Sequence, residues 1–315
     1  MKSVSAEESL KADPPAGVTR ADLLALTKFR LSALVIITTF FGFWLNSTHG
    51  VDYALLLHTL IGATLAAFGA AVFNQLMEIE PDSRMKRTAD RPLPARRMEP
   101  GIAFGLGWLL SAFALIHLAK MVNVESAAVT ALTLAVYLFI YTPMKQRSEW
   151  NTIVGAVSGA LPPLIGWAGA AGVASEADAY FRIDIFMASG AGYLFLLLFL
   201  WQLPHFLAIN WMYRDEYRKG GFVMWANDDD TGNRTARLAL IFSILSAALM
   251  FLPVMSGQTS VYFLIPSLLI NAVLIVLSLR FQKARDRVAA RKLFLFTLLY
   301  LPALLVCTAL FWRRA

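Results

Sequence analysis

Long apolar runs separated by short polar stretches dominate the chain. Nine of them approach the ~20 largely apolar residues that a membrane-spanning helix needs. They cover residues 27–46, 53–73, 101–119, 125–142, 151–170, 186–208, 238–254, 260–279 and 293–311. Each run is predicted to be a helix, because an open sheet edge would leave backbone groups unsatisfied in lipid. The pattern therefore predicts an all-α polytopic membrane protein.

Composition agrees with membrane embedding. Of 315 residues, 58% are hydrophobic and only 16% are charged, whereas soluble domains carry about 25% charged residues. The single cysteine, Cys307, lies inside an apolar run, which excludes an intramolecular disulfide framework. Residues 1–22 are mostly polar, contain prolines and lack the apolar core of a signal peptide. We predict a disordered cytoplasmic tail at 1–22 and a single transmembrane domain at 23–315.

Charge in the connecting loops predicts the orientation. The loops after the second, fourth, sixth and eighth runs are rich in Lys and Arg, and the others are short, neutral or acidic. By the positive-inside rule the N-terminus and the basic loops are cytoplasmic and the C-terminus lies outside. Arg313 and Arg314 oppose this orientation. The absence of an Arg-rich, acid-poor presequence favours a bacterial plasma membrane over a mitochondrial one.

The second apolar run ends in an unusual polar stretch, NQLMEIEPDSRMKRTADRPLP. Asn74, Glu78 and Asp82 recur every four residues, which places them on one face of a helix, with Glu80 opposite. One amide and two carboxylates form an oxygen-rich set that suits Mg²⁺ shared with substrate phosphates. Pro81 is predicted to break or kink the helix near residue 80. Whether Asp82 shares the face of the other two is therefore open.

Basic side chains follow these acids directly. Arg84, Lys86, Arg87 and Arg91 are placed to neutralise and orient phosphate groups. The alternative is an ordinary solvated loop in which the basic residues serve topology. Acids at a membrane edge are costly, which favours the functional interpretation.

Two further clusters lie at predicted cytoplasmic helix ends. Asp215 and Glu216, in WMYRDEYRKGG, follow the sixth run and suggest a diphosphate held between metal ions at two acidic clusters. Tyr141 and Lys145, in YTPMKQR with Arg147, are candidate donors to phosphate oxygens. The alternatives are a solvated loop for the acids, and an interfacial aromatic with topology-setting basic residues for the second cluster.

His205 differs from the other histidines because it follows Pro204 within an apolar run. Its ring has two open interpretations: contact with a porphyrin iron or propionate, or a bond to a helix carbonyl that the proline frees. His58 and His117 lie near the predicted outer ends of helices and are expected at the interface. The polar stretch ANDDDTGNRT is predicted to be a turn and helix cap. No P-loop, HExxH or GxGxxG motif is present, and no nucleic-acid partner is expected.

The pattern NxxxExExDxRMxRTxxRPLP resembles the first aspartate-rich motif of UbiA-type intramembrane prenyltransferases. The stretches RMKRTADRPLP, YTPMKQRSEWNTIVGAVSGALPPLIGWAG and WQLPHF, the last followed by a DEY-containing loop, resemble more narrowly the branch that farnesylates protohaem IX. Together they cover most of residues 25–255. Their order and spacing make the resemblance specific, and the count of nine helices agrees with it.

The resemblance implies nine helices around a central cavity, capped by cytoplasmic loops. It implies Mg²⁺ as cofactor, with metal ligands Asn74, Glu78, Asp82 and Asp215. The implied catalytic residues are Asn74, Glu78, Asp82, Tyr141 and Lys145, and the implied substrate-binding residues are Arg84, Arg87, Arg91, Arg147, His205, Asp215 and Glu216. This chain departs from the family pattern in three ways: Glu78 and Glu80 stand for aspartates, Pro81 for an apolar residue, and GGFVMWANDDD for a G-I-P-M-L-P-V run.

The implied reaction transfers a farnesyl group from farnesyl diphosphate to a vinyl group of haem b. Water addition would give haem O for haem-copper oxidases, and haem A synthase or oxidase assembly factors are the implied partners. One alternative is a UbiA-type enzyme that acts on an aromatic acid or quinone precursor. A transporter of an anionic substrate is a second, although the inverted repeats typical of that class are not evident.

Overall fold

The computed structural model describes residues 18–172 and 181–313. Within this part every regular element is helical, apart from an isolated bridge between Thr259 and Trp312. Nine helical segments there are long and apolar enough to span a membrane. They are α2 (Phe29–Asn46), α3 (Tyr53–Met77), α5 (Pro100–Met121), α6–η2–α7 (Val124–Met144), α8–α9 (Asn151–Ala170), α11 (Ser189–Met212), α13–α14 (Asn233–Met255), η3–α15 (Val261–Ala284) and α16 (Arg287–Phe311). The prediction of an all-α protein with nine spans is confirmed.

Several helices extend beyond the apolar runs that predicted them. The second span continues to Met77 instead of residue 73, and the ninth begins at Arg287 instead of residue 293. The Asp286 side chain caps the ninth helix by accepting from the Ala289 N–H at 2.7 Å. A helix continues through polar residues wherever its backbone bonds are satisfied, whereas hydropathy follows only contact with lipid.

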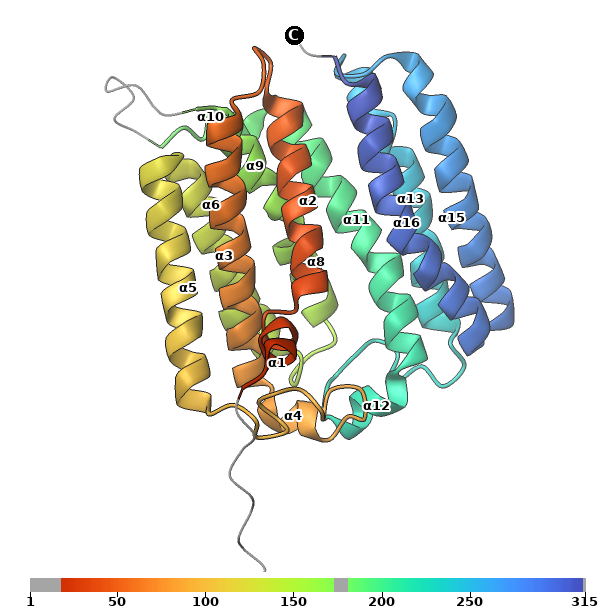
Figure 1. The fold of residues 1–315 in the computed structure, drawn as a ribbon. Coiled ribbons are helices and arrows are strands. Elements are labelled where there is room, and N and C mark those ends of the chain that lie inside the picture. Colours follow the sequence, from red (N-terminus) through yellow and green to blue (C-terminus); the bar gives the residue numbers. More distant parts are fainter. Residues whose placement is uncertain (1–17, 173–180, 314–315) are drawn as a thin grey trace, which may run out of the picture.

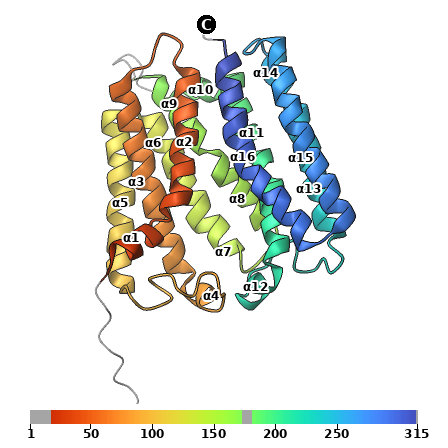
Figure 2. The ribbon, with the colours of Figure 1, turned by 45° about the vertical axis from the view of Figure 1, so that its right-hand side comes forward.

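Two views show how the spans are arranged. In Figures 1 and 2, α2, α3, α5, α6 and α9 gather on one side and α13, α15 and α16 on the other, with α11 between them. Two short helices, α4 (Ile79–Ser83) and α12 (Arg214–Lys219), lie together at one end of the bundle. The short helix α10 (Asp184–Met187) lies at the opposite end, near the C-terminus. The α4 and α12 end is called the capped end below.

The largest buried cluster joins α11 to the helices on its far side. Tyr193 of α11 and Tyr300 of α16 are fully buried there. The Tyr193 hydroxyl pairs with the Thr308 hydroxyl at 3.0 Å, and Tyr300 donates to Asn271 at 2.8 Å. Large apolar side chains such as Leu109 stay exposed on the outer faces. Such a surface is suited to lipid rather than to water.

The described chain begins inside the predicted N-terminal tail. Residues 1–17 lie outside the described residues, as does Arg314. Helix α1 (Arg20–Leu26) already starts before the expected boundary at residue 23, and Thr19 and Asp22 form its capping box. Asp22 also pairs with Arg97 at 2.9 Å, which ties α1 to the loop that precedes α5. The last residues of the expected tail are therefore part of the packed domain.

Candidate active site

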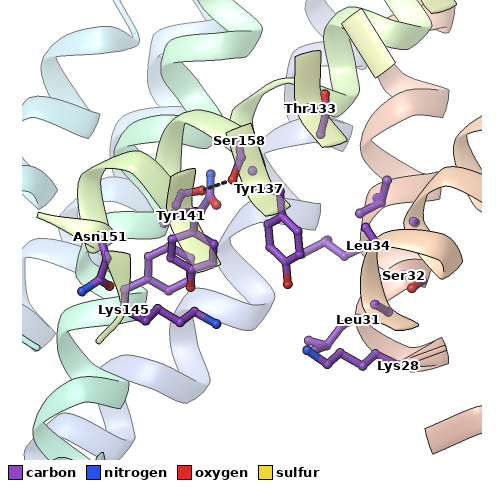
Figure 3. Close-up of a pocket in the computed structure, with 18 of the residues that line it drawn as sticks. Lys28, Leu31, Ser32, Leu34, Thr133, Tyr137, Tyr141, Lys145, Asn151 and Ser158 are labelled. Carbon is purple, nitrogen blue, oxygen red and sulfur yellow. Dashed lines mark hydrogen bonds between the residues drawn. The ribbon is translucent and has the colours of Figure 1, made fainter. Parts of the chain in front are cut away.

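A cavity of about 440 Å³ opens within the bundle, between α2, α3, η2 (Val136–Tyr141), α8 (Asn151–Ala160) and α11. Its lining divides into two parts. One part is charged and is supplied by Lys28, Glu78, Asp82, Arg87, Arg91 and Lys145. The other is apolar and aromatic, with alanines of α3 and with leucine and aromatic side chains of α2 and α11. Figure 3 shows Lys28 and Lys145 extending into this space from opposite walls.

The first acidic cluster lies at the corner between α3 and α4. The chain leaves helical geometry at Glu78 (φ −109°, ψ 16°), two residues before the break that Pro81 predicted. Hydrogen bonds nevertheless continue four residues apart, from the Glu78 N–H to Asn74 O and from the Asp82 N–H to Glu78 O. Pro81 is the third residue of α4, where a missing N–H leaves no bond unmade. Asn74, Glu78 and Asp82 therefore keep one face, and their exposed fractions are 0, 3 and 1%.

Each of these three buried side chains has a cationic partner. The Lys28 ammonium donates to the side-chain oxygen Oδ1 of Asn74, and the side-chain NH₂ of Asn74 donates to the Thr142 hydroxyl at 3.3 Å. The Lys145 ammonium donates to Glu78 Oε1 at 2.8 Å. Asp82 Oδ2 accepts from Arg91. The positive charges offset the cost of burying two carboxylates.

One carboxylate oxygen in this cluster is left over. Asp82 Oδ1 is enclosed and has no hydrogen-bond partner among the described residues. A buried oxygen without a donor suits a cation, so the residues fit a Mg²⁺ ion. The described part of the chain holds no group of three His, Cys, Asp or Glu side chains that could bind a metal ion by themselves. A metal here would rely on two carboxylates, the Asn74 amide and oxygens of a bound substrate.

Burial and the neighbouring charges shift the pKa values of these groups. Burial lowers the pKa of Lys28 to about 7, helped by the nearby Arg91 charge. Burial also raises the pKa of Asp82, although Arg91 opposes it. For Lys145 burial acts in the same direction as for Lys28, but the adjacent Glu78 carboxylate outweighs it and raises the pKa of Lys145. The charged end thus holds one firmly protonated ammonium, Lys145, and one that titrates near neutrality, Lys28.

Lys28 was not predicted as a site residue. It separates α1 from α2 and adopts a left-handed conformation (φ 48°, ψ 44°). This conformation is uncommon for a residue other than glycine. It directs the ammonium toward Asn74 and into the cavity. The position of Lys28 at the edge of the first apolar run, with Arg30 two residues later, was the available signal, since charge at a membrane edge is costly.

The fourth span changes from an α-helix to a π-helix where it reaches the cavity. Val136–Tyr141 form a π-helical segment, which often marks a functional position. Tyr137 and Tyr141 project from it into the cavity (Figure 3). The Lys145 Nζ lies 4.6 Å from the centre of the Tyr141 ring, a cation–π contact. The structure thus brings Tyr141 and Lys145 together with Glu78, despite the intervening Pro143.

The second acidic cluster points elsewhere. The Asp215 side chain is 78% exposed and lies 3.9 Å from Arg214, outside the cavity lining. Glu216 accepts from the backbone N–H of Arg87 at 3.2 Å. The cavity is lined instead by Tyr217, whose hydroxyl accepts from the Arg87 guanidinium at 3.2 Å. The structure therefore does not bring Asp215 to the predicted metal ligands.

Two of the predicted phosphate-binding arginines also lie apart. Arg84 is exposed and pairs with Glu80, which itself is 75% exposed. Arg147 is exposed and does not line the cavity. In the predicted turn-and-cap stretch, the N-cap residue of α13 is Gly232, and Asp229, three residues earlier, accepts from the Thr235 N–H in the first turn of α13 at 2.7 Å. Arg87 and Arg91 remain as the loop arginines in the cavity lining.

His205 lines the cavity in its apolar part. Its Nδ1 lies 2.8 Å from the Thr297 hydroxyl, so its partner is a side chain of α16 and not the carbonyl that the proline would free. His58 and His117, which were predicted to lie at the interface, are outside the cavity lining, and their ring nitrogens are 3.3 Å apart. Asn210, also from α11, lines the cavity and is only 5% exposed. Sequence reasoning did not select it.

Comparison with known proteins gives consistent matches over nearly the whole chain. Residues 35–301 match the model of the UbiA prenyltransferase family. A protoheme IX farnesyltransferase of Solibacter usitatus (strain Ellin6076) is 39% identical over 290 residues, which cover 89% of this chain and 95% of the relative. The protein of that name from Opitutus terrae (strain DSM 11246 / JCM 15787 / PB90-1) is 36% identical, over 94% of this chain and 96% of its own. The mitochondrial protein of Arabidopsis thaliana is 35% identical, over 88% and 62%.

Solved structures share the fold at low sequence identity. A digeranylgeranylglyceryl phosphate synthase is similar with a TM-score of 0.72 and 15% identity, over 92% of this chain and 97% of that one. A UbiA homolog from Archaeoglobus fulgidus, bound to GPP and Mg²⁺, is similar with a TM-score of 0.58 and 12% identity, over 91% and 99%. These likenesses show that the chain shares the fold of these proteins.

Proposed function

The chain belongs to the UbiA prenyltransferase family, and we propose that it transfers a farnesyl group from farnesyl diphosphate to a vinyl group of protohaem IX. Water addition then gives haem O, the precursor needed for haem-copper oxidases, and diphosphate. The relatives that support this proposal carry the name protoheme IX farnesyltransferase and span most of the chain.

The division of the cavity carries the proposal. Its charged end, with two buried carboxylates and several cations, suits a diphosphate and a divalent metal ion. Its apolar and aromatic part suits a polyprenyl chain and the face of a porphyrin. The lining therefore matches both substrates, and their reacting ends would meet near the boundary between the two parts.

The diphosphate is proposed to bind between the two lysines. Glu78, Asp82 and Asn74 would hold Mg²⁺, with the unpartnered Oδ1 of Asp82 as one ligand. When bound, that ion would neutralise the diphosphate and improve it as a leaving group. Lys145 and Lys28 reach the same space from opposite walls. Their donation to phosphate oxygens requires that they release Glu78 and Asn74, at least in part.

The chain's own residues would then assist cleavage of the allylic C–O bond. Lys145, Arg87 and Arg91 stabilise the negative charge that develops on the leaving oxygens. The rings of Tyr137 and Tyr141 line the cavity beside Lys145 and offer π faces to the cation-like allylic carbon. The apolar walls exclude bulk water until the haem vinyl group has attacked. Water adds to the resulting cation, and the departing diphosphate is a nearby base for the proton released.

The orientation follows from the charges at the capped end. The loops that carry α4 and α12 hold many basic residues, which supports a cytoplasmic position for that end and an outside position for the C-terminus. We propose a bacterial plasma membrane as the location. Haem A synthase or oxidase assembly factors are the proposed partners, because haem O is a hydrophobic product that a neighbour would take over.

The test is a substrate competition with purified protein. The protein is incubated with Mg²⁺ and farnesyl diphosphate, together with haem b or with 4-hydroxybenzoate, and products are identified by mass spectrometry. Haem O formed only in the first mixture supports the proposal. Prenylated benzoate without haem O would assign the protein to the aromatic-acid branch of the family and overturn it.

A further inference from the structure

His205 has one ring nitrogen held by the protein and one that is available. Its Nδ1 lies 2.8 Å from the Thr297 hydroxyl. That hydroxyl also lies 2.6 Å from the Phe294 carbonyl, to which it can only donate. The hydroxyl has a single hydrogen, so it must accept from His205. Nδ1 therefore carries the proton, and Nε2 is a bare nitrogen with a lone pair.

Nothing in the described chain uses that lone pair. The only hydrogen bond of the His205 ring among the described residues is the one to Thr297. The ring lines the cavity and is held by aromatic neighbours, at 5.4 Å from the Trp201 ring and 5.0 Å from the Phe294 ring. Neutral imidazole with one nitrogen anchored and the other free is the usual arrangement of a metal-ligating histidine.

The surroundings restrict what the nitrogen can bind. On α11 the lining side chains next to His205 include Trp201, Phe206 and Ile209. The polar ones, Gln202 and Asn210, are neutral amides, so a small hydrated cation would meet no carboxylate on this helix. A metal that arrives inside a flat apolar ring would bring its other ligands with it. Alanines of α3, including Ala63, Ala66 and Ala70, also line the cavity and leave room for a planar group.

We propose that His205 Nε2 is an axial ligand of the haem iron during turnover. This rests on the proposed function, because the iron is that of the haem substrate. His205 lies seven residues before the end of α11 at Met212, about 10 Å along the helix. Iron at that depth places the rim of the porphyrin, with its vinyl groups, between His205 and the charged end. Thr297 is a positioning residue, because it fixes the tautomer and the ring orientation.

The experiment measures ligation without farnesyl diphosphate. Purified wild type, His205→Ala and the control His58→Ala are loaded with ferric haem b, and absorption, resonance Raman and EPR spectra are recorded. We expect an iron–histidine signature in wild type and in His58→Ala, its loss in His205→Ala, and a haem affinity lower by on the order of 10- to 100-fold. Imidazole added to His205→Ala should restore the signature.

A second pair of variants tests the positioning. Thr297→Val should shift the iron–histidine signature and weaken haem binding by up to about tenfold, whereas Thr297→Ser should behave as wild type. Unchanged spectra in His205→Ala, or no recovery with imidazole in a variant that elutes as wild type, would overturn the proposal. Ligation by His205 in a protein that makes no haem O would refute the proposed reaction and would leave His205 as the ligand of a bound haem, so the two failures are distinguishable.

Discussion

At two corners of the bundle, a long helix turns into a short one with the same backbone conformation, but the side chains differ. At the first, α3 ends at Met77, Glu78 has φ −109° and ψ 16°, and α4 follows. At the second, α11 ends at Met212, Tyr213 has φ −119° and ψ 20°, and α12 follows. Hydrogen bonds four residues apart cross both breaks. The two corners are thus equivalent when Glu78 is matched to Tyr213.

This match explains the different positions of the acids. The inward positions of the first corner hold Asn74, Glu78 and Asp82, and those of the second hold Ile209, Tyr213 and Tyr217. The second residue after the break-point residue is directed outward in both corners: the side chain of Glu80 is 75% exposed and that of Asp215 is 78% exposed. Helical phase, not the number of acids, decides which corner can bind a metal ion.

The tyrosines of the second corner support an arginine of the first. The Arg87 guanidinium lies 5.0 Å from the Tyr213 ring centre and 5.5 Å from that of Tyr217. Glu216 accepts from the Arg87 backbone. The second corner therefore holds the loop of the first in place over the cavity. The first corner thus supplies the buried acids of the proposed metal site, and the second supplies rings that hold the Arg87 loop in place.

Removal of the metal ion should have the largest effect. A chelator should reduce haem O formation to background and weaken farnesyl diphosphate binding strongly, because the lysines and arginines are paired with the acids and the metal ion would supply the further positive charge that the diphosphate needs. Added Mg²⁺ should restore both. Binding of farnesyl diphosphate, measured by calorimetry with and without Mg²⁺, should lose its metal dependence in Asp82→Asn and keep it in Asp215→Asn. The opposite result would reverse the comparison of the two corners.

Glu78→Gln should come next. The change keeps the shape of the side chain, removes its charge and leaves Lys145 without its carboxylate partner. We expect kcat to fall by about 100-fold or more, as when one charge-stabilising group is removed. Glu80→Gln, in the same corner but exposed, is the matched control and should retain activity. Near-normal turnover of Glu78→Gln would exclude it from the site.

The architecture was predictable from the sequence because lipid demands long apolar helices. All nine predicted spans correspond to helical spans in the described chain. The stripe of Asn74, Glu78 and Asp82 was predictable from spacing, but its survival across Pro81 was not, since it depends on where the break falls. The break at Glu78 places the proline in a first turn, where it does no harm.

The remainder of the site could not be predicted from local pattern. Lys28 lies 46 residues before Asn74, and its position depends on its own left-handed backbone conformation, which no sequence motif predicts. Asp215 was selected for its charge, while its phase on α12 directs it away from the cavity. The match of Asp215 to the exposed Glu80 emerges only when the two corners are aligned on their break points, which the structure supplies.

Lys28→Gln should have an intermediate effect and would sharpen the role of the first corner. It removes the charge that reaches Asn74 and, by our proposal, the diphosphate. A charged hydrogen bond contributes about 1.5–3 kcal/mol, so KM for farnesyl diphosphate should rise by about 10- to 100-fold. Lys28→Arg should recover part of the affinity. A change in kcat with KM unaltered would argue against binding of the substrate by Lys28.

Asp215→Asn should change little. The carboxylate is exposed and 3.9 Å from Arg214, and exposed ion pairs contribute little. We expect kcat/KM for farnesyl diphosphate within about twofold of wild type. Tyr217→Phe is the inward-facing comparison at the same corner, and it should have the larger effect because Arg87 loses a partner. A loss of activity in Asp215→Asn greater than in Tyr217→Phe would show that α12 turns inward during turnover.

The smallest effect on catalysis is expected from Asp229→Ala, behind the second corner. Asp229 caps the first turn of α13, and loss of such a cap costs about 0.5–2 kcal/mol of stability without touching the cavity. Burial opposes ionisation, but the Thr235 N–H and neighbouring donors outweigh it and hold the pKa of Asp229 below its ordinary 3.8. A lowered pKa means that the charged Asp229 side chain stabilises the protein fully above the ordinary value and loses its contribution as the pH falls through the folded-state pKa.

Thermal unfolding should therefore show a lower stability of Asp229→Ala than of wild type at pH 7, and a smaller difference below the folded-state pKa. The kcat of the variant should be unchanged at pH 7. A pH-independent gap in stability would mean that Asp229 acts by packing, and a fall in kcat would mean that the second corner contributes an acid to the chemistry after all.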